Sequence, residues 1–238
     1  MPEVMLPSPE TETLHRLREF IRPAAWRRAW LKRTFDIIFS VSFLLAFSPL
    51  FALLALFIRC SSKGRVFYRS VRLGLSGKVI WCWKFRTMYA DADLRLKSLL
   101  QAHPELRSEW DLYQKLRQDP RITPIGKLLR KMSLDELPQF WNVLKGDLSV
   151  VGPRPPTLVG PPERYLHEVH QFYGPSTFKI LSVRPGITGI WQVSGRSKIP
   201  LEQRRKLEET YVDTHTVWGD FVIVMKTIPA VLFSRGAF

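Results

Sequence analysis

The strongest hydrophobic pattern in the chain is an uncharged run of 22 residues between Ile37 and Ile58. An apolar helix of this length can span a bilayer core of roughly 30 Å. Basic residues follow the run as densely as they precede it, so the charge asymmetry of a simple span is missing. Ser48 and Pro49 interrupt its middle, where proline removes a backbone donor. We therefore expect a re-entrant helix-break-helix hairpin over residues 34–59, with a straight or kinked span and a buried soluble helix as alternatives.

Residues 1–33 place apolar positions near helical spacing among many basic side chains, with Trp26 and Trp30 close to the end. This combination is typical of a helix that lies at the level of the lipid head groups. We expect a basic amphipathic interfacial segment here, and an ordinary surface helix is the alternative. Asp36, at the start of the apolar run, needs a neighbouring partner because a lone carboxylate is costly in lipid.

Shorter patterns follow in residues 60–238. Two β-type runs after residue 65 are separated by a turn that contains glycine and serine, which predicts a hairpin. Successive side chains alternate in a strand, so Lys84 and Arg86 point to the same side of the second run. A solvated sheet edge explains these two cations as well as a binding site does.

Helical patterns dominate the rest of the chain. We expect helices over residues 90–118, with a break at His103 and Pro104, from Ile125 to Lys131, and from Leu201 to Asp213. The last apolar run, residues 221–233, is too short to span a membrane. The predicted fold class is α+β: a mostly helical domain with a small β-hairpin, anchored by the membrane hairpin.

The net charge of the chain indicates which classes of binding partner to expect. The chain has 36 Lys and Arg against 21 Asp and Glu, a formal net charge of +15, so anionic partners such as phospholipid, nucleic acid or phosphorylated substrates are expected. The two cysteines, Cys60 and Cys82, match neither a disulfide framework nor a metal-binding spacing. A hydrophobic fraction of 45% is enough for a folded core.

The stretch SLDELPQ, residues 133–139, has two adjacent carboxylates, Asp135 and Glu136. Ser133 and Glu136 match a capping box, in which both side chains accept hydrogen bonds from backbone N–H groups at a helix start. Pro138 allows another interpretation, because it can be the first helical residue and leave both carboxylates upstream.

A second interpretation of the pair is chemical. Arg130 precedes it by five residues, and GDLSVVGPRPP follows it with Arg154. A carboxylate can attack phosphorus when Mg²⁺ and arginines offset the repulsion between the nucleophile and the phosphate. A helix start would also keep Asp135 ionised. The cap and the nucleophile are compatible with each other.

Several rare strings occur in order: KFRTM (84–88), DPRITPIGKLLRKMSLDELPQFWNVLKGDLSVVGPRP (119–155), RPGITGIWQVSGR (184–196) and a terminal RGAF. In these strings the chain resembles the bacterial sugar transferases that are monotopic phosphoglycosyl transferases. The resemblance runs from about Lys32 to the C-terminus, and the Ser-Pro break resembles the re-entrant membrane helix of that family. Larger members carry further N-terminal membrane helices, so the likeness is to their catalytic module alone.

The resemblance implies transfer of a sugar 1-phosphate from a UDP-sugar to undecaprenyl phosphate, initiating surface polysaccharide synthesis such as exopolysaccharide or O-antigen. Asp135 would attack the β-phosphate, release UMP and hold the phosphosugar, and Glu136 would orient it or bind Mg²⁺. Residues 60–238 would form the catalytic domain at the cytoplasmic face of the bacterial inner membrane. The string details look closer to enzymes that use galactose or glucose donors.

The resemblance also assigns binding residues. Phosphate contacts are expected for Lys84, Arg86, Arg130 and Arg154, and nucleotide contacts for Arg184, Gly186, Thr188, Gln192 and Arg196, with a structural loop as the alternative for the second group. Mg²⁺ is the expected cofactor, with Asp135 and Glu136 as ligands. A homodimer is left open, and nucleic acid is not an expected partner of the enzyme. The competing hypothesis is a basic membrane-surface protein that binds anionic lipid or nucleic acid without chemistry.

Overall fold

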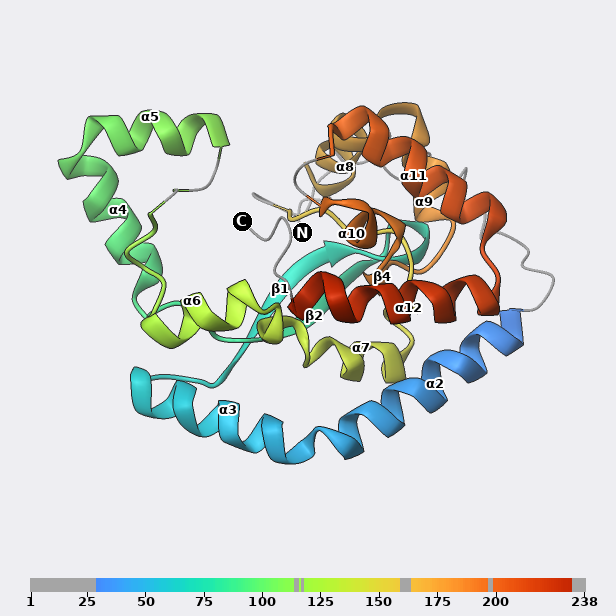
Figure 1. The fold of residues 1–238 in the computed structure, drawn as a ribbon. Helices are drawn as coiled ribbons and strands as arrows, with labels where there is room; N and C mark the ends of the chain where they lie inside the picture. Colours follow the sequence, from blue (N-terminus) through green and yellow to red (C-terminus); the bar gives the residue numbers. More distant parts are fainter. Residues whose placement is uncertain (1–28, 114–115, 117, 159–163, 197–198, 233–238) are drawn as a thin grey trace, which may run out of the picture.

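The computed structural model describes residues 29–113, 116, 118–158, 164–196 and 199–232 (Figure 1). The first part of the chain holds α2 (Ala29–Ala46), α3 (Ser48–Ser61), β1 (Phe67–Leu73), η1 (Leu75–Gly77), β2 (Val79–Phe85), α4 (Ala92–Ala102), α5 (Pro104–Tyr113), α6 (Pro124–Lys131) and η2 (Leu134–Glu136). The second part holds α7 (Gln139–Lys145), β3 (Ser149–Val151), α8 (Tyr165–Tyr173), η4 (Gly174–Ser176), α9 (Thr177–Leu181), β4 (Gly186–Thr188), α10 (Ile190–Ser194), α11 (Leu201–Thr214) and α12 (Val217–Leu232). The mostly helical character and the small hairpin confirm this part of the predicted fold class.

The apolar run forms two helices rather than one. Helices α2 and α3 meet at Phe47 and are bent by 62°. The hydroxyl of Ser48 donates to the Leu45 carbonyl at 2.8 Å, and Pro49 lies in the first turn of α3. Within the described chain no single helix meets the length and hydropathy of a membrane span, whereas this bent pair does so when taken together. The predicted break is therefore confirmed.

The boundary expected after residue 33 lies inside a helix. Helix α2 already begins at Ala29, so residues 29–33 continue into the apolar run. The rest of the predicted interfacial segment, residues 1–28, is outside the described residues.

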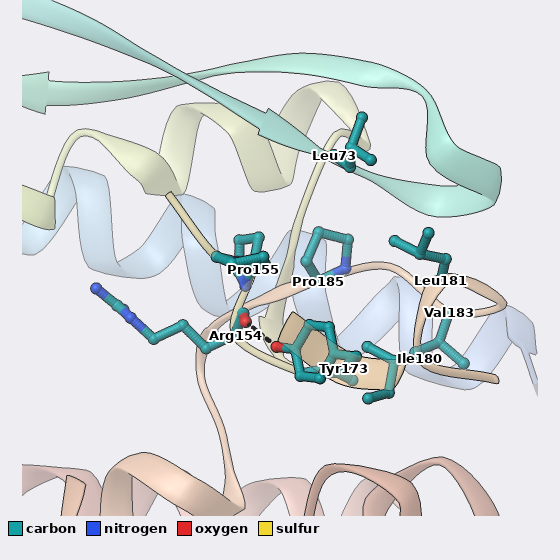
Figure 2. Close-up of a pocket in the computed structure, with 10 residues that line it drawn as sticks. Leu73, Arg154, Pro155, Tyr173, Ile180, Leu181, Val183 and Pro185 are labelled. Carbon is teal, nitrogen blue, oxygen red and sulfur yellow. Dashed lines mark hydrogen bonds between the residues drawn. The ribbon is translucent and has the colours of Figure 1, made fainter. Parts of the chain in front are cut away.

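The predicted hairpin is confirmed as an antiparallel pair, with Tyr68 opposite Lys84 and Arg72 opposite Ile80. These positions share one face because cross-strand partners point to the same side. Leu73, at the end of β1, belongs to one core cluster with Tyr173 and with Ile180 of α9, and all three side chains line the pocket drawn in Figure 2. The face that carries Arg72 and Lys84 also carries Ile80, which belongs to a second core cluster.

A second, parallel pair joins β3 to β4, with Ser149 opposite Gly186. A Cβ at Gly186 would collide with the backbone of Gly152, so glycine is required here by the close approach of two chain segments. This approach, rather than one to a ligand, is what the structure shows for Gly186.

The largest core cluster joins the hairpin to α7 and β3 and is covered by α2. Its buried members are Ile80, Cys82, Phe140, Val143, Leu148, Val150, Val151 and Tyr211. From α2, Phe43 stacks on Phe140 with ring centroids 4.1 Å apart, and Phe39 lies 6.0 Å from the same ring. Burial of each such side chain contributes roughly 1.5–3 kcal/mol, so α2 is an integral part of the core.

A buried polar network also holds α2 in place. Lys32 Nζ lies 3.1 Å from Asp36 Oδ1 and 2.8 Å from Asp220 Oδ2 of α12. Asp36 Oδ1 in addition accepts hydrogen bonds from the Ser149 hydroxyl and the Val150 N–H, each at 3.0 Å. The predicted partner of Asp36 is confirmed, and one lysine serves two buried carboxylates.

Replacing Lys32 with methionine should lower the free energy of unfolding by about 3–5 kcal/mol, because two buried carboxylates lose their shared cation. Denaturant unfolding of the detergent-solubilised protein measures this change. The matched control is Lys145→Met, which removes a half-exposed lysine 3.1 Å from Asp147 and should cost about 0–1 kcal/mol. Equal losses in the two variants would contradict the prediction.

Candidate active site

The two adjacent carboxylates lie on a short 3-10 turn between two helices. Helix α6 ends at Lys131, Ser133 adopts a left-handed conformation with φ 55°, and the turn spans Leu134–Glu136. Helix α7 begins three residues after the pair, with Pro138 at its N-cap position. Ser133 makes no capping hydrogen bond with its side chain, and the carboxylate of Glu136 binds cations instead of backbone N–H groups. The capping-box interpretation is therefore wrong. Both carboxylates lie upstream of α7, as the alternative expected, but the first helical residue is Gln139 and not Pro138.

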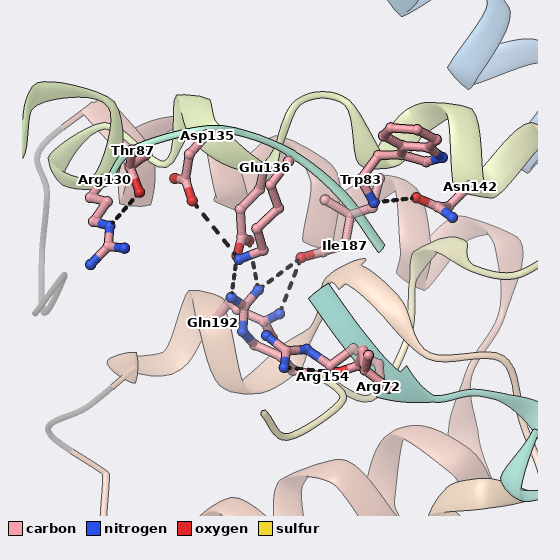
Figure 3. A network of polar contacts seen from close by, with 12 residues as sticks. Arg72, Trp83, Thr87, Arg130, Asp135, Glu136, Asn142, Arg154, Ile187 and Gln192 are labelled. Carbon is pink, nitrogen blue, oxygen red and sulfur yellow. Dashed lines mark hydrogen bonds and ion pairs between the residues drawn. The ribbon is translucent and has the colours of Figure 1, made fainter. Parts of the chain in front are cut away.

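Helix α7 holds this turn against the hairpin through Asn142, which is fully buried. The amide oxygen of Asn142 accepts from the Trp83 N–H, and its amide nitrogen donates to the Trp81 carbonyl, both at 2.8 Å. The side chain thus satisfies backbone groups of β2 as a neighbouring strand would. This contact places Lys84, the next residue of β2, against the two carboxylates (Figure 3).

Glu136 is bound by two cations. Its Oε1 accepts from Lys84 Nζ at 2.7 Å and from Arg154 Nη2 at 2.6 Å, and its Oε2 accepts from Arg154 Nη1 at 2.8 Å (Figure 3). This bidentate arrangement is the strongest geometry that arginine and carboxylate can form. Burial acts to raise the pKa of Glu136, but Arg154 and Lys84 outweigh it and hold that pKa well below its usual range. The ion pairs with Arg154 and Lys84 therefore favour the anionic form of Glu136.

Asp135 has a different environment. Its Oδ2 lies 3.8 Å from Lys84 Nζ, and its side chain is largely buried. Burial raises the pKa of Asp135, and the neighbouring Glu136 adds to this effect, while Lys84, Arg130 and Arg154 oppose it. The net direction is upward. The groups that favour the ionised form of Asp135 are the neighbouring cations rather than the start of α7, which lies further along the chain.

Helix α6 brings Arg130 to the same place. The Thr123 hydroxyl caps α6 by accepting the Gly126 N–H at 3.0 Å, and the absence of a side chain at Gly126 lets the helix approach the Thr87 carbonyl. One turn on, Arg130 Nε donates to the Thr87 hydroxyl at 2.9 Å (Figure 3). This hydrogen bond joins Thr87, which follows β2, to α6, which precedes the turn with Asp135.

Two residues of this site were not predicted. Thr87 positions Arg130, and Arg72, on the hairpin face that carries Lys84, is buried close to Arg154 (Figure 3). Burial lowers the pKa of Arg72, with Arg154 acting in the same direction and Glu136 against it. The alternation of side chains in β1 was the signal that pointed to Arg72, because it places this arginine on the side of Tyr68 and Lys84.

Helix α10 borders the site through the string RPGITGIWQVSGR. Gln192 Nε2 donates to the Ile187 carbonyl at 3.3 Å, and the same oxygen lies 3.5 Å from Arg154 Nη1. Burial lowers the pKa of Arg196, with the nearby Arg154 acting in the same direction. Three buried polar atoms here have no hydrogen-bond partner in the described chain: Trp191 Nε1, Gln192 Oε1 and Arg196 Nε. Such orphaned atoms are expected where a polar ligand binds.

Other predicted ligand residues have structural partners. Arg86 donates to the Ser62 and Lys63 carbonyls at 2.7 and 2.8 Å, which closes the C-terminal end of α3. Arg184 donates to the Gly146 carbonyl at 2.9 Å, and the hydroxyls of Thr188 and Thr227 share a hydrogen bond of 2.7 Å. The structure thus brings Lys84, Arg130, Asp135, Glu136, Arg154, Gln192 and Arg196 together, whereas a ligand role for Arg86, Arg184, Gly186 and Thr188 stays a prediction.

The donor set has a limited capacity for a metal. No three His, Cys, Asp or Glu side chains gather as ligands anywhere in the described ranges. Mg²⁺ commonly takes one or two carboxylates and completes its octahedron with substrate phosphates and water. Asp135, with one ion-pair contact, fits such a site. Glu136 accepts three hydrogen bonds and fits an orienting role better.

Comparison with known proteins gives the family. The family profile of the bacterial sugar transferases matches residues 27–234. Exopolysaccharide production protein ExoY of Rhizobium meliloti is 41% identical over 207 residues, which cover 87% of this chain and 88% of the relative. The undecaprenyl-phosphate galactose phosphotransferase of Salmonella typhimurium is 43% identical over 210 residues, 88% of this chain and 42% of the relative. The UDP-glucose:undecaprenyl-phosphate glucose-1-phosphate transferase of Escherichia coli is 36% identical over 203 residues, 83% of this chain and 39% of the relative.

The matched range includes α2, the hairpin, the carboxylate pair and every cation that contacts it. It decides between the two functional hypotheses that the sequence raised, because a basic surface protein without chemistry does not account for a shared enzyme family. The chain belongs to the bacterial sugar transferase family and is an enzyme of the phosphoglycosyl transferase class.

Proposed function

We propose that the protein transfers a sugar 1-phosphate from a UDP-sugar to undecaprenyl phosphate through a covalent intermediate on Asp135. The observation that carries this proposal is a weakly engaged, buried Asp135 next to a Glu136 whose charge Arg154 and Lys84 already balance. Substitution at phosphorus by a carboxylate requires such a nucleophile among cations. The names of the relatives from Salmonella typhimurium and Escherichia coli support the acceptor.

In the first step, a carboxylate oxygen of Asp135 attacks the β-phosphorus of the donor. The new bond joins this oxygen to phosphorus, and the bond from that phosphorus to the bridging oxygen breaks. UMP leaves with the electron pair, and the product is an acyl phosphate between Asp135 and the sugar 1-phosphate. The site must offset the negative charge on both phosphates, and the cations near Asp135 that can do so are Lys84 and Arg130.

In the second step, a phosphate oxygen of undecaprenyl phosphate attacks the same phosphorus. The bond between Asp135 and phosphorus breaks, the carboxylate is regenerated, and the product is a diphosphate-linked lipid sugar. Because both steps use one phosphorus and one carboxylate, the site needs no second nucleophile. Glu136 is held in place by Arg154 and thereby keeps the adjacent Asp135 in the same position during both steps.

The proposed cofactor is Mg²⁺, which would offset phosphate charge in the transition state when bound. Asp135 and the donor diphosphate would hold it. The protein's own residues bind and orient: Lys84 and Arg130 face the nucleophile, and α10 offers its orphaned polar atoms to the nucleotide.

The proposed location is the cytoplasmic face of the bacterial inner membrane, with α2 and α3 as a re-entrant hairpin in one leaflet. Large apolar side chains of these helices point away from the domain: Ile38, Leu45 and Leu56 are 61%, 70% and 58% exposed. Exposed apolar surface of this extent marks a contact with lipid or with a partner. Lipid is favoured because the acceptor carries a polyprenyl chain.

The proposed sugar is galactose or glucose, since named relatives include enzymes for each. The reaction would initiate a surface polysaccharide, in keeping with the name of the relative from Rhizobium meliloti. Homodimer formation stays a prediction.

The central test is a donor screen. Detergent-solubilised protein with Mg²⁺ and undecaprenyl phosphate should release UMP from UDP-galactose or UDP-glucose. Asp135→Asn should lower kcat at least about 10³-fold and abolish the phosphosugar adduct seen by intact-protein mass spectrometry, because the nucleophile is lost. Asp213→Asn, which changes an exposed carboxylate paired with Lys179, is the control and should keep wild-type turnover. Turnover retained in Asp135→Asn would end the nucleophile assignment.

The pH dependence of kcat/KM should report the ionisation of Asp135. Its raised pKa means that the inactive, protonated form persists to higher pH than for an ordinary aspartate, and Lys84 opposes this shift. Lys84→Met should therefore move the acid limb upward by about 1 pH unit, whereas Lys84→Arg, which keeps the charge, should move it much less. An unmoved limb in Lys84→Met would show that Lys84 does not act on Asp135.

Membrane topology tests the hairpin. In cells, a tag at residue 1 should be inaccessible from outside, because both ends of a re-entrant hairpin face the cytoplasm. Pro49→Ala restores a backbone donor at the break and should expose the tag in a measurable fraction of molecules. Pro104→Ala, at the start of α5, is the control and should leave the tag inaccessible. An accessible tag in the wild type would refute re-entrance.

A further inference from the structure

The arginine that binds Glu136 lies in an unusual segment, Pro153-Arg154-Pro155-Pro156. Proline has no backbone N–H, so the N–H of Arg154 is the one main-chain donor among residues 153–156. The prolines on both sides restrict the backbone, and the residue before a proline is limited further. The backbone of this segment is therefore rigid, and the residues that hold it in place determine the position of the Arg154 guanidinium.

Side chains from two helices hold both backbone polar groups of Arg154. The Arg154 N–H donates to Glu208 Oε1 of α11 at 3.2 Å. The Arg154 carbonyl accepts from the Tyr173 hydroxyl at 2.6 Å and from Arg204 Nη2 at 3.1 Å (Figure 2 shows the first of these). Glu208 and Tyr173 are fully buried.

Arg204 is itself held on several sides. Its guanidinium carbon lies 3.9 Å from the ring centroid of Trp191 and 4.8 Å from that of Phe172. Its Nη2 donates to the Tyr173 hydroxyl at 3.3 Å, and its Nε is 3.7 Å from Glu208 Oε1. The stacking and the hydrogen bonds tie α8, α10 and α11 to the main chain of Arg154.

This arrangement is costly for the folded state. Glu208 Oε2 has no hydrogen-bond partner in the described chain, and burial raises the pKa of Glu208 to about 7. A buried carboxylate with few partners destabilises a fold, and such features are retained mainly at functional sites. No contact links Glu208, Tyr173 or Arg204 to Asp135 or Glu136 directly, and their shared neighbour in the site is Arg154.

We propose that Tyr173, Arg204 and Glu208 are positioning residues that hold the main chain of Arg154 and thereby align its guanidinium with Glu136. The alignment matters because a bidentate bond needs both nitrogens opposite both oxygens, and small misplacements in a site can lower a rate up to about 10²-fold. The effect on turnover rests on the proposed function, whereas the effect on Arg154 itself does not.

The test is Tyr173→Phe, which removes one hydroxyl and keeps the ring that packs in the core. We expect kcat for UMP release to fall about 5–10-fold in the wild-type background. In an Arg154→Lys background the same change should lower kcat less than about twofold, because lysine is a point charge without a fork to align. A purely structural role would instead give equal losses in both backgrounds, which would overturn the proposal.

The control is Tyr211→Phe, which also removes a buried hydroxyl, one whose oxygen lies 2.9 Å from both Asp220 Oδ1 and the Val151 carbonyl oxygen. It should lower the melting temperature about as much as Tyr173→Phe does, yet leave kcat within about twofold. A fall in kcat as large as that of Tyr173→Phe would overturn the proposal.

A second readout needs no substrate. Phenylglyoxal modifies arginine, and peptide mass spectrometry gives its rate at Arg154. This rate should rise several-fold in Tyr173→Phe and stay unchanged in Tyr211→Phe. Unchanged modification in Tyr173→Phe would overturn the proposal. A wild-type protein that releases no UMP from any UDP-sugar would overturn the proposed function alone, since the modification rates still decide the role of Tyr173.

Discussion

The bidentate ion pair between Arg154 and Glu136 is the interaction on which the rest of the site depends. Two neighbouring carboxylates repel each other, and burial makes the repulsion larger. With Arg154 and Lys84 on Glu136, one of the two charges is balanced and the other is left for chemistry. Four segments must meet for this to happen: β2 with Lys84, the turn with the pair, the proline-rich segment after β3 with Arg154, and α6 with Arg130.

The ion pair between Arg154 and Glu136 also makes the two carboxylates chemically different. The pKa of Glu136 is held well below its usual range, while that of Asp135 is raised. Titratable neighbours whose environments drive their pKa values apart commonly have different roles. Glu136 is the carboxylate that binds Arg154, and in the proposed mechanism Asp135 is the carboxylate that forms and breaks the bond to phosphorus. Sequence order alone does not distinguish the two, because both belong to the same short turn.

Local features of this fold were predictable because short-range patterns determine them. The hairpin follows from alternation and its turn, the break follows from Ser48 and Pro49, and helices α4, α5, α6 and α11 follow from helical patterns in the sequence. The capping box failed for a local reason as well: the left-handed Ser133 and the later start of α7 at Gln139 separate the motif from the helix. Alternation placed Arg86 on the side of Lys84, but β2 ends between them and Arg86 donates to the end of α3.

The partners of the site residues, by contrast, come from distant parts of the chain. Glu208 is 54 positions from Arg154, and Asn142 is 59 positions from Trp83, so no local sequence pattern predicts either contact. Only packing of α11 and α7 brings them into place. The resemblance to a family could point to Arg154, because a motif contains it, but could not indicate what holds Arg154.

The contacts between α2 and α7 fix the position of the proposed membrane hairpin relative to the site. Arg33 of α2 donates to the Val143 and Leu144 carbonyls at 2.6 and 2.8 Å, near the C-terminal end of α7. Helix α7 is seven residues long, about 10 Å at 1.5 Å per residue, and its other end begins three residues after Glu136. With the Lys32 network on the same helix, the distance between α2 and Asp135 is set by rigid elements. In the proposed arrangement, the depth of the hairpin in the leaflet therefore determines the height of Asp135 above the lipid, and the phosphate of a membrane-bound acceptor can reach the same atom in every turnover.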